Sequence, residues 1–185
     1  MADVRRRHPG FWEAVRADAS ITAANRGERH QFTSGVDALC QAIRLATVSD
    51  AFLGQAYYRA KAAMQARGIP ILPRIAHRKA MSTAQVCIGD PVVMAPGVYL
   101  AHGQVVIDGI TEIESGVTIF PWVTIGLRPP DVQGPKIEAR AKIGTGSKLL
   151  GAITIGKFAK VGANAVVLCD VPANKTATGI PATVR

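Results

Sequence analysis

Apolar side chains recur every six residues through the second half of the chain. The aliphatic positions that share this spacing are Ile107, Ile113, Ile119 and Ile125, then Ile137, Ile143, Leu149, Ile155, Val161 and Val167. A helix stripe would recur about every 3.6 residues and one face of a flat strand every 2. Short strands joined by corners, three hexapeptides to a turn, instead point one side chain per hexapeptide inward. The spacing therefore predicts a three-sided parallel β-helix over residues 86–185.

Small residues and glycines between these aliphatics support the same fold. The second column, four residues after each aliphatic position, holds Thr111, Val117, Val123, Ala141, Ser147, Ile153, Ala159, Ala165 and Val171. Glycine directly follows four of the aliphatics, at Gly126, Gly144, Gly156 and Gly162. Such residues suit a narrow interior and tight corners.

The six-residue register is interrupted at two places. Ile88, Met94 and Leu100 are displaced by one residue from the later positions, which predicts an irregular corner between His102 and Val106. The gap from 125 to 137 keeps the register but skips one position. We therefore expect residues 126–136 to leave the ladder as a loop.

The first half has apolar residues at helical spacing. The expected buried faces are Phe11, Trp12, Val15 and Ala19; Val36, Leu39, Cys40, Ile43 and Thr47 behind a cap at Ser34; and Leu53, Ala56, Tyr57, Ala60 and Met64 from Ser49 onward. Gly68 and Pro70 end the third helix. Residues 71–85 are expected to form a short helix and a linker. The predicted class is α+β, with an α-helical domain (1–85) before a β-helix domain (86–185).

Composition agrees with a narrow core in a reduced environment. Apolar residues make up 48% of the chain but aromatic residues only 5%. The three cysteines, Cys40, Cys87 and Cys169, form no CxxC pair, which argues against a disulfide framework and a structural zinc site. No apolar run approaches the ~20 residues that span a bilayer, and no apolar segment follows the first arginines. We expect a cytoplasmic protein with no membrane partner.

The net charge of +9 is concentrated in the first half. Residues 1–85 carry 13 Lys and Arg against 6 Asp and Glu, whereas residues 86–185 carry 9 against 7. The cations are scattered, and no aromatic residues alternate with them for base stacking. We therefore expect no nucleic-acid partner. The charge fits a solvated helical surface or the attraction of acidic small molecules.

One stretch, from Ile143 to Ala182, reads IGTGSKLLGAITIGKFAKVGANAVVLCDVPANKTATGIPA. It resembles the closing coils of serine O-acetyltransferases and their relatives among the hexapeptide-repeat, left-handed β-helix acyltransferases. The segment AHGQVVIDG (101–109) resembles the family's histidine-containing coil, and FWEAVRADASITAANRGER (11–29) resembles its amino-terminal helices.

This resemblance implies transfer of an acetyl group from acetyl-CoA to the hydroxyl of serine or another small acceptor. It also implies a homotrimer with active sites between adjacent prisms, or a dimer of such trimers. Because the chain ends at Arg185 directly after its last coil, we expect no tail for docking to cysteine synthase.

His102 is the candidate general base. Acetyl transfer needs a group that removes the acceptor's proton and then protonates the leaving thiolate, and an imidazole can do both near neutral pH. His8 and His30 lie in a flexible or helical surface context, and His77 lies in a basic linker. His102 coincides with the register shift, where an irregular strand would aim it outward, and it matches the family's catalytic histidine. No cysteine is placed as a nucleophile, so we expect direct attack on the thioester.

The resemblance assigns contacts with acetyl-CoA to Gly126, Thr145, Ala163 and Lys160. The first three supply backbone groups for the pantetheine amides, and Lys160 supplies a cation for the phosphates. Lys148 and Lys157 are alternative cations. The coils hold a single histidine, so no zinc site of the kind that several converging histidines build is expected.

Glu28, Trp122 and Asp131 are the candidates for contact with the acceptor. Glu28 lies in the segment where the family carries an acidic residue that holds serine. Trp122 would narrow the acceptor pocket or pack under the loop of residues 126–136. Asp131, within that loop, would contact an amine or orient His102, because loops on a rigid scaffold tend to carry function.

The sequence departs from the serine enzymes on the acceptor side. Ala101 stands where the family has an aspartate before the histidine, and Gln133 and Gly134 stand where it has an Arg-His pair. The identity of the acceptor is therefore open. Two alternatives remain: an N-acetyltransferase for an amino sugar, and a trimer that serves as a scaffold or regulator without catalysis.

Overall fold

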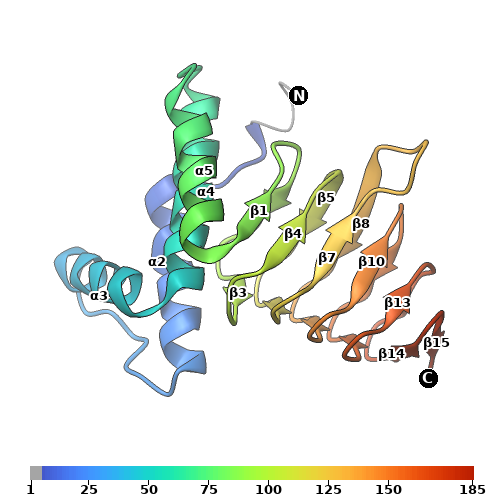
Figure 1. The fold of residues 1–185 in the computed structure, drawn as a ribbon. Helices are drawn as coiled ribbons and strands as arrows, with labels where there is room; N and C mark the ends of the chain where they lie inside the picture. The colour runs from blue at the N-terminus through green and yellow to red at the C-terminus, as the bar shows by residue number, and fades with distance from the viewer. Residues whose placement is uncertain (1–5) are drawn as a thin grey trace.

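The computed structural model of the chain describes residues 6–185 and places a layer of helices at one end of a three-sided coil (Figure 1). The helices are α2 (Phe11–Asn25), α3 (Gly35–Val48), α4 (Asp50–Ala66) and α5 (Leu72–Ala84). The coil follows directly, because Gln85 takes a left-handed conformation (φ 53°) between the end of α5 and the first strand. The predicted order of helices before a β-helix is confirmed.

Within residues 6–185, the strands form three sheets, one on each side of the coil. Sheet A contains β1 (Val86–Ile88), β4 (Val105–Ile107), β7 (Thr124–Gly126), β10 (Lys148–Leu150) and β13 (Val166–Val167). Sheet B contains β2 (Val93–Met94), β5 (Ile110–Ile113), β8 (Gln133–Ile137) and β11 (Thr154–Ile155). Sheet C contains β3 (Tyr99–Leu100), β6 (Thr118–Ile119), β9 (Lys142–Ile143), β12 (Lys160–Val161), β14 (Thr176–Gly179) and β15 (Ala182–Val184).

Successive turns pair in parallel, whereas β15 folds back antiparallel on β14. The left-handed parallel β-helix expected from the six-residue spacing is confirmed.

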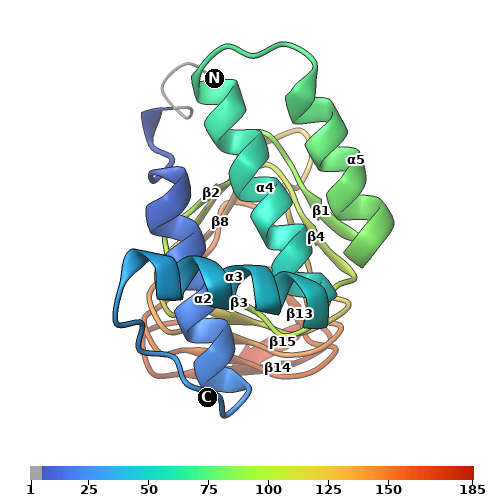
Figure 2. The ribbon, with the colours of Figure 1, turned by 90° about the vertical axis from the view of Figure 1, so that its left-hand side faces the viewer.

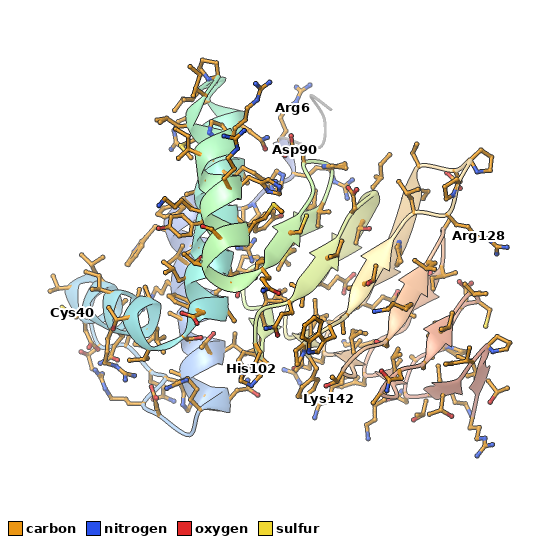
Figure 3. The ribbon with its side chains drawn as sticks, viewed as in Figure 1. Arg6, Cys40, Asp90, His102, Arg128 and Lys142 are labelled. Atoms are coloured by element: carbon orange, nitrogen blue, oxygen red, sulfur yellow. The ribbon has the colours of Figure 1, made fainter. Side chains whose placement is uncertain are left out.

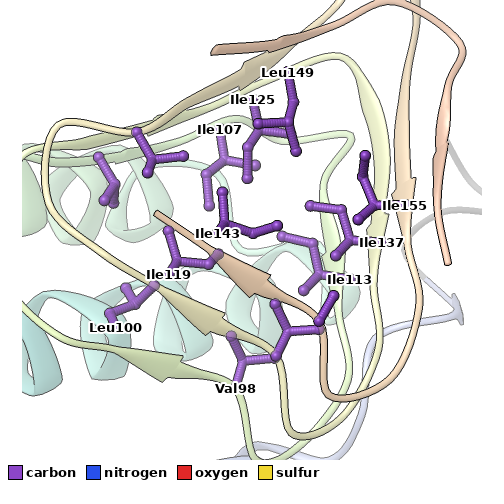
Figure 4. Close-up of a cluster of buried hydrophobic side chains, with 14 of the residues drawn as sticks. Val98, Leu100, Ile107, Ile113, Ile119, Ile125, Ile137, Ile143, Leu149 and Ile155 are labelled. Carbon is purple, nitrogen blue, oxygen red and sulfur yellow. The ribbon is translucent and has the colours of Figure 1, made fainter. Parts of the chain in front are cut away.

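The core of the coil consists of three stacked ladders of aliphatic side chains (Figure 4). They are Ile107, Ile125 and Leu149 from sheet A; Ile113, Ile137 and Ile155 from sheet B; and Leu100, Ile119 and Ile143 from sheet C. None of these side chains is more than 2% exposed. Burying each contributes about 1.5–3 kcal/mol, so the ladders are the main source of stability in the coil.

The first turn of the coil is one residue longer than a regular turn. Ile88 pairs with Ile107 and Leu100 with Ile119, a separation of nineteen residues, whereas Ile137 pairs with Ile155 after eighteen. The extra residue lies in the corner after β3, where Gln104 has a φ of 59°. The register shift predicted around His102 is therefore confirmed.

Helix α4 lies across the open end of the first turn (Figure 2) and satisfies its carbonyl groups. The donors are Gln55 to Val98 O (2.9 Å), Tyr58 to Val92 O (2.8 Å), Arg59 to Met94 O (2.5 Å) and Ala95 O (2.7 Å), and Lys61 to Ile88 O (2.6 Å). Strand edges left open would carry unpaired backbone groups and would recruit other chains. These buried polar side chains close that edge.

The predicted buried face of α4 is therefore wrong. Leu53, Ala56, Tyr57, Ala60 and Met64 are only partly buried, and the fully buried positions are Ala51, Phe52, Gly54, Gln55, Tyr58, Arg59, Lys61 and Ala62. Polar residues occupy the inner face because their ends hydrogen-bond to the coil, which a count of apolar positions does not detect.

The predicted face of α3 is also wrong, and that of α2 is partly wrong. In α3, Val36 (73% exposed) and Ile43 (58%) face solvent, as do Leu39, Cys40 and Thr47. The inward positions are Ala38, Ala42 and Leu45. In α2, Val15 and Ala19 are buried as expected, but Phe11 and Trp12 are exposed. Alanines on the inner face allow the helices to approach closely.

The predicted ends of the helices hold better than their faces. Ser34 and Ser49 cap α3 and α4 through their side chains, and Gly68 follows the end of α4 with a φ of 72°. Residues 72–84 form one continuous helix, so His77 lies on α5 and not in a linker. In the part of the chain that the structure describes, no helix is long and apolar enough to span a bilayer.

Candidate functional site

His102 lies on the edge of the coil where sheet C turns into sheet A, which we call the C/A corner. Leu100, Ile119, Ile143 and Val161 are paired in register on sheet C, so the residues two positions further on share this edge in successive turns. These residues are His102, Pro121, Thr145 and Ala163. Backbone hydrogen bonds between the turns, such as Gly146 N–H to Pro121 O (2.9 Å) and Asn164 N–H to Thr145 O (2.8 Å), hold the corners in line.

The corner that carries His102 is joined to the end of α5. The backbone N–H of Gln104 donates to Ala84 O (2.9 Å), and that of Val105 donates to Gln85 O (3.2 Å). A Cβ at Gly103 would lie 1.8 Å from Ala84 O, so only glycine permits this approach. The position of His102 is thus fixed by a helix end as well as by the coil.

A cavity of 480 Å³ opens beside His102, between the coil and the ends of three helices. Its lining includes Arg26 after α2, Ser49 and Asp50 at the start of α4, Ser82–Gln85 at the end of α5, and Ala101–Gln104 with Pro121 from the coil. His102 is exposed to solvent at this cavity, and no hydrogen bond within residues 6–185 ties up its ring. The imidazole is therefore accessible to a small molecule bound in the cavity.

The cavity offers both a cation and an anion to an acceptor. Arg26 supplies a guanidinium, and Asp50 supplies a carboxylate in the first turn of α4. A carboxylate ligand would be drawn to Arg26 and to the α4 N-terminus, and an amine would be drawn to Asp50. A small molecule with both charges fits this lining.

Glu28 acts on this cavity through Arg26. Its carboxylate accepts from Arg26 Nε at 2.9 Å and is also paired with Arg44. Hydrogen bonds from Arg44 and then Arg26 lower the pKa of Glu28. Glu28 is not among the residues that line the cavity. The expectation of direct contact between Glu28 and the acceptor stays a prediction, and the observed contact is with a side chain that lines the site.

An apolar cavity of 340 Å³ continues from the first along the outer face of sheet A. Gln85 and Gln104 line both cavities. The apolar lining consists of Met81, Cys87, Val106, Trp122 and Val123. Trp122 is 59% exposed with a φ of 65°, and Lys148 Nζ donates to its carbonyl at 2.8 Å. Trp122 thus lies one turn from His102 on the same edge. A ligand that extended from the His102 cavity into this second cavity would contact Trp122.

The predicted acetyl-CoA residues lie at three places on the coil. Thr145 and Ala163 are exposed on the C/A corner, in line with His102. Lys160 begins β12 on sheet C and, with Arg140 and Lys142, lines a hollow of 430 Å³. Gly126 instead ends β7, on the edge between sheets A and B. One chain therefore aligns two of the four residues, Thr145 and Ala163, with His102.

Asp131 lies in the loop that replaces the corner between β7 and β8. The loop projects from the coil, and Figure 3 shows Arg128 on it, pointing away from the coil and far from His102. Asp131 accepts a hydrogen bond from Gln133 N–H at 2.8 Å and is exposed. Within one chain the loop is therefore remote from His102, and Trp122 does not pack beneath it.

Arg26, Asp50 and Gln104 are lining residues that sequence reasoning did not single out. Asp50 follows the capping residue Ser49, and Arg26 lies just after a helix, so both are at helix ends, where side chains converge on neighbouring elements. Their positions at helix ends are the feature of the sequence that could have indicated a role in the site. Within residues 6–185, no group of three or more His, Cys, Asp and Glu side chains could hold a metal ion.

Comparison with known proteins finds serine acetyltransferases, although no family model matches the chain. The serine acetyltransferase of Helicobacter pylori (strain 26695) is 36% identical over 125 residues, which cover 66% of this chain and 73% of that protein. The serine acetyltransferase of Bacillus licheniformis is 46% identical over 89 residues, covering 46% of this chain and 41% of that protein. The chain spans about two fifths of the length of several of the curated relatives that it matches.

The fold has solved counterparts. The soybean serine acetyltransferase apoenzyme aligns with 96% of this chain and 69% of its own chain, with a TM-score of 0.78 and 28% identity. The likeness therefore extends over the helices and the coil together.

Proposed function

Because this chain belongs to the serine acetyltransferase family, we propose that it transfers the acetyl group of acetyl-CoA to the hydroxyl of serine or another small acceptor. The observation that carries the proposal is the exposed imidazole of His102 at the 480 Å³ cavity, on the same edge as Thr145 and Ala163. The edge aligns exposed positions for acetyl-CoA with a base, and the cavity gives the acceptor a place beside that base.

His102 is the general base in this proposal. One ring nitrogen accepts the hydroxyl proton while the oxygen attacks the thioester carbon, the C–S bond breaks, and the imidazolium returns the proton to the thiolate of CoA. The acceptor's carboxylate is held by Arg26, which Glu28 orients, and its amine by Asp50. This assignment favours an amino acid with a hydroxyl.

Acetyl-CoA lies along the C/A corner in the proposal. Backbone groups at Thr145 and Ala163 are open to the pantetheine amides, because both residues are exposed. The phosphates reach the basic hollow lined by Arg140, Lys142 and Lys160. Gly126 on the other edge contacts the cofactor only if a neighbouring chain brings that edge to the groove.

A homotrimer supplies that arrangement. The outer surface around sheet A exposes Met81 (44%), Val106 (44%), Trp122 (59%) and Leu168 (41%). Packing against a neighbouring coil would bury this apolar surface and would bring the neighbour's edge between sheets A and B, with Gly126 and Asp131, toward His102. Sedimentation equilibrium would then give three times the 19.5 kDa chain mass.

The release of free CoA thiol tests the activity. The purified protein is incubated with acetyl-CoA and, in parallel, with L-serine, L-homoserine, a sugar alcohol or an amino sugar. We expect turnover with a hydroxyl amino acid and a decrease of about 10²–10⁴-fold in His102→Ala. His30→Ala, which changes an exposed histidine outside the cavity, is the matched control. Turnover that persists in His102→Ala would contradict the assignment of His102 as the base. Release of CoA only with amino sugars would contradict O-transfer and would favour N-transfer.

A further inference from the structure

A basic cavity of 330 Å³ lies between α4, α5 and the corner that joins β1 to β2. It is lined by Lys61, Gln65, Pro73, Arg74, His77, Arg78, Gly89 and Asp90. Figure 3 shows Asp90 and His102 at opposite ends of the first turn of the coil. From Arg74 to Ala84, which lines the His102 cavity, α5 rises by about 15 Å. The basic cavity is therefore separate from the candidate active site.

The charges around this cavity do not cancel. Lys61, Arg74 and Arg78 are cations, whereas Asp90 is the one carboxylate in the lining. The lining therefore carries an excess of two positive charges. The pKa of His77 is lowered, first by burial and then by Lys61, with Asp90 opposing. The neutral ring still offers a donor to an anion in the cavity.

Lys61 is held rigidly in the wall of this cavity. Its side chain is 3% exposed, and Nζ donates to Ile88 O at 2.6 Å and to Asp90 Oδ1 at 2.9 Å. An ammonium group has three N–H donors, so one is left for a ligand. The free-energy cost of removing the Lys61 ammonium from water is already included in the folding of the chain. An anion that enters the cavity therefore meets a cation whose position is fixed.

Arg74 and Arg78 stand one helical turn apart on α5. Both are exposed, and within residues 6–185 neither takes part in an ion pair or a side-chain hydrogen bond. Guanidinium groups match the oxygens of phosphate in a two-pronged geometry. Two such groups facing one cavity, without carboxylate partners, are available to a bound anion.

We propose that this cavity binds a dianionic phosphate group, held by Lys61, Arg74, His77 and Arg78. The two negative charges of the phosphate balance the excess charge of the lining. An adjoining cavity of 230 Å³, lined by residues that include Gln65, Gly68 and Pro70, gives room for the rest of a phosphate ester. Ile71 (66% exposed) and Leu72 (50%) follow Pro70 at the start of α5. The phosphate can thus come from a soluble ester or from a lipid headgroup. The proposal does not depend on acetyl transfer.

Isothermal titration of the full chain with inorganic phosphate and with pyrophosphate tests the site, with chloride at matched ionic strength in the cell. We expect saturable binding that weakens at least tenfold in Arg74→Ala and in Arg78→Ala. Lys79→Ala is the matched control, because Lys79 is an exposed cation on the same helix but is not in the lining. All three positions are exposed, so the variants should fold. Thermal unfolding of each variant checks this.

Sedimentation with vesicles that contain phosphatidic acid, whose headgroup is a phosphate monoester, or with vesicles of phosphatidylcholine alone distinguishes the two sources. Phosphate binding without recruitment to vesicles supports a soluble ester. Phosphate binding together with recruitment to phosphatidic acid, both lost in Arg74→Ala, supports a headgroup. The proposal is overturned if phosphate and pyrophosphate do not bind saturably, or if Lys79→Ala weakens binding as much as Arg74→Ala does.

Discussion

Arg59 on α4 and Asp18 on α2 form an ion pair in the interior, with Nε and Oδ2 at 2.8 Å and side chains only 2% and 1% exposed. Arg59 also donates to the carbonyls of Met94 and Ala95, and Asp18 accepts from the backbone N–H groups of Gly97 and Val98. Each partner thus hydrogen-bonds to the first turn of the coil as well as to the other. The pair joins two helices to the coil at one point.

Removing one member of this pair should be strongly destabilising. Asp18→Ala leaves a buried guanidinium without its counter-charge and leaves two backbone N–H groups unpaired, so we expect a loss of about 3–5 kcal/mol in the free energy of unfolding. Urea unfolding followed by far-UV circular dichroism measures it. Arg29→Ala, which breaks the exposed pair with Asp37, is the comparison and should shift the urea midpoint little. Equal shifts in the two variants would contradict a joining role for the buried pair.

Gly103→Ala should disable the site by moving His102. The added Cβ would lie 1.8 Å from Ala84 O, so the corner must separate from the end of α5. A displacement of about 1 Å can cost about 100-fold in rate, and we expect such a loss in acetyl transfer together with a lower melting temperature. Gly35→Ala is the control, because nothing lies within 4 Å of its added Cβ. Full activity in Gly103→Ala would show that this contact does not fix the corner.

The β-helix could be predicted from sequence because each aliphatic in the six-residue ladder has one interior to point into. Ile107 and Ile125 lie on the same side of the coil because eighteen residues, one turn, separate them, and Leu149 joins them because the turn that contains the loop of residues 126–136 is longer by one six-residue side. The irregular corner at His102 could be predicted for the same reason, since a ladder with one fixed period reveals any added residue.

The helix faces could not be predicted in the same way. Gln55, Arg59 and Lys61 are buried because they hydrogen-bond to carbonyls 27 to 43 residues later in the chain. Local periodicity does not carry that information. The same limit applies to the cavity, where Arg26 and Asp50 meet His102 only after the helices dock on the first turn.

The stability of the fold should decrease as the pH falls below about 6.5. Burial, then Arg59, Lys61 and Arg7, lower the pKa of His8, which is half-buried against Tyr58 and so is not the flexible surface residue expected from sequence. In the unfolded chain His8 binds a proton near pH 6.5, whereas in the folded chain it binds a proton only at a lower pH. The contribution of a neutral His8 is therefore present above that pH and is lost as the pH falls toward the lowered value.

Urea midpoints at pH 7.5 and 5.5 measure this dependence. His8→Phe keeps a ring against Tyr58 and removes the titration, so its midpoint should fall less between the two pH values than that of the parent chain. His77, whose pKa is also lowered, accounts for part of what remains. His30→Asn, at an exposed position, should retain the full dependence. A midpoint in His8→Phe that falls as steeply as in the parent would contradict the assignment.

Arg26 and Asp50 should determine affinity for an acceptor that carries both charges. Arg26→Ala and Asp50→Asn each remove one charged hydrogen bond, worth about 1.5–3 kcal/mol. We expect kcat/KM for the best hydroxyl amino acid to fall about 10–100-fold, mainly through a higher KM. Arg16→Ala, an exposed arginine of α2 that is outside the cavity lining, should have no such effect. An unchanged KM in both variants would exclude this acceptor position.

A large side chain at Ala163 should block the groove for acetyl-CoA. Ala163 is exposed on the C/A corner, three turns along from His102, so Ala163→Trp would occupy the surface where the pantetheine arm is proposed to lie. The weakening expected is at least about tenfold in Kd, or ~1.4 kcal/mol, measured by titration with CoA alone. Val36→Trp adds a large ring at a position on α3 that is 73% exposed and lies on no edge of the coil, and this variant should bind CoA normally. If both variants bind CoA as the parent does, the cofactor does not lie along this edge. If both weaken equally, the loss has a cause other than steric block at the corner.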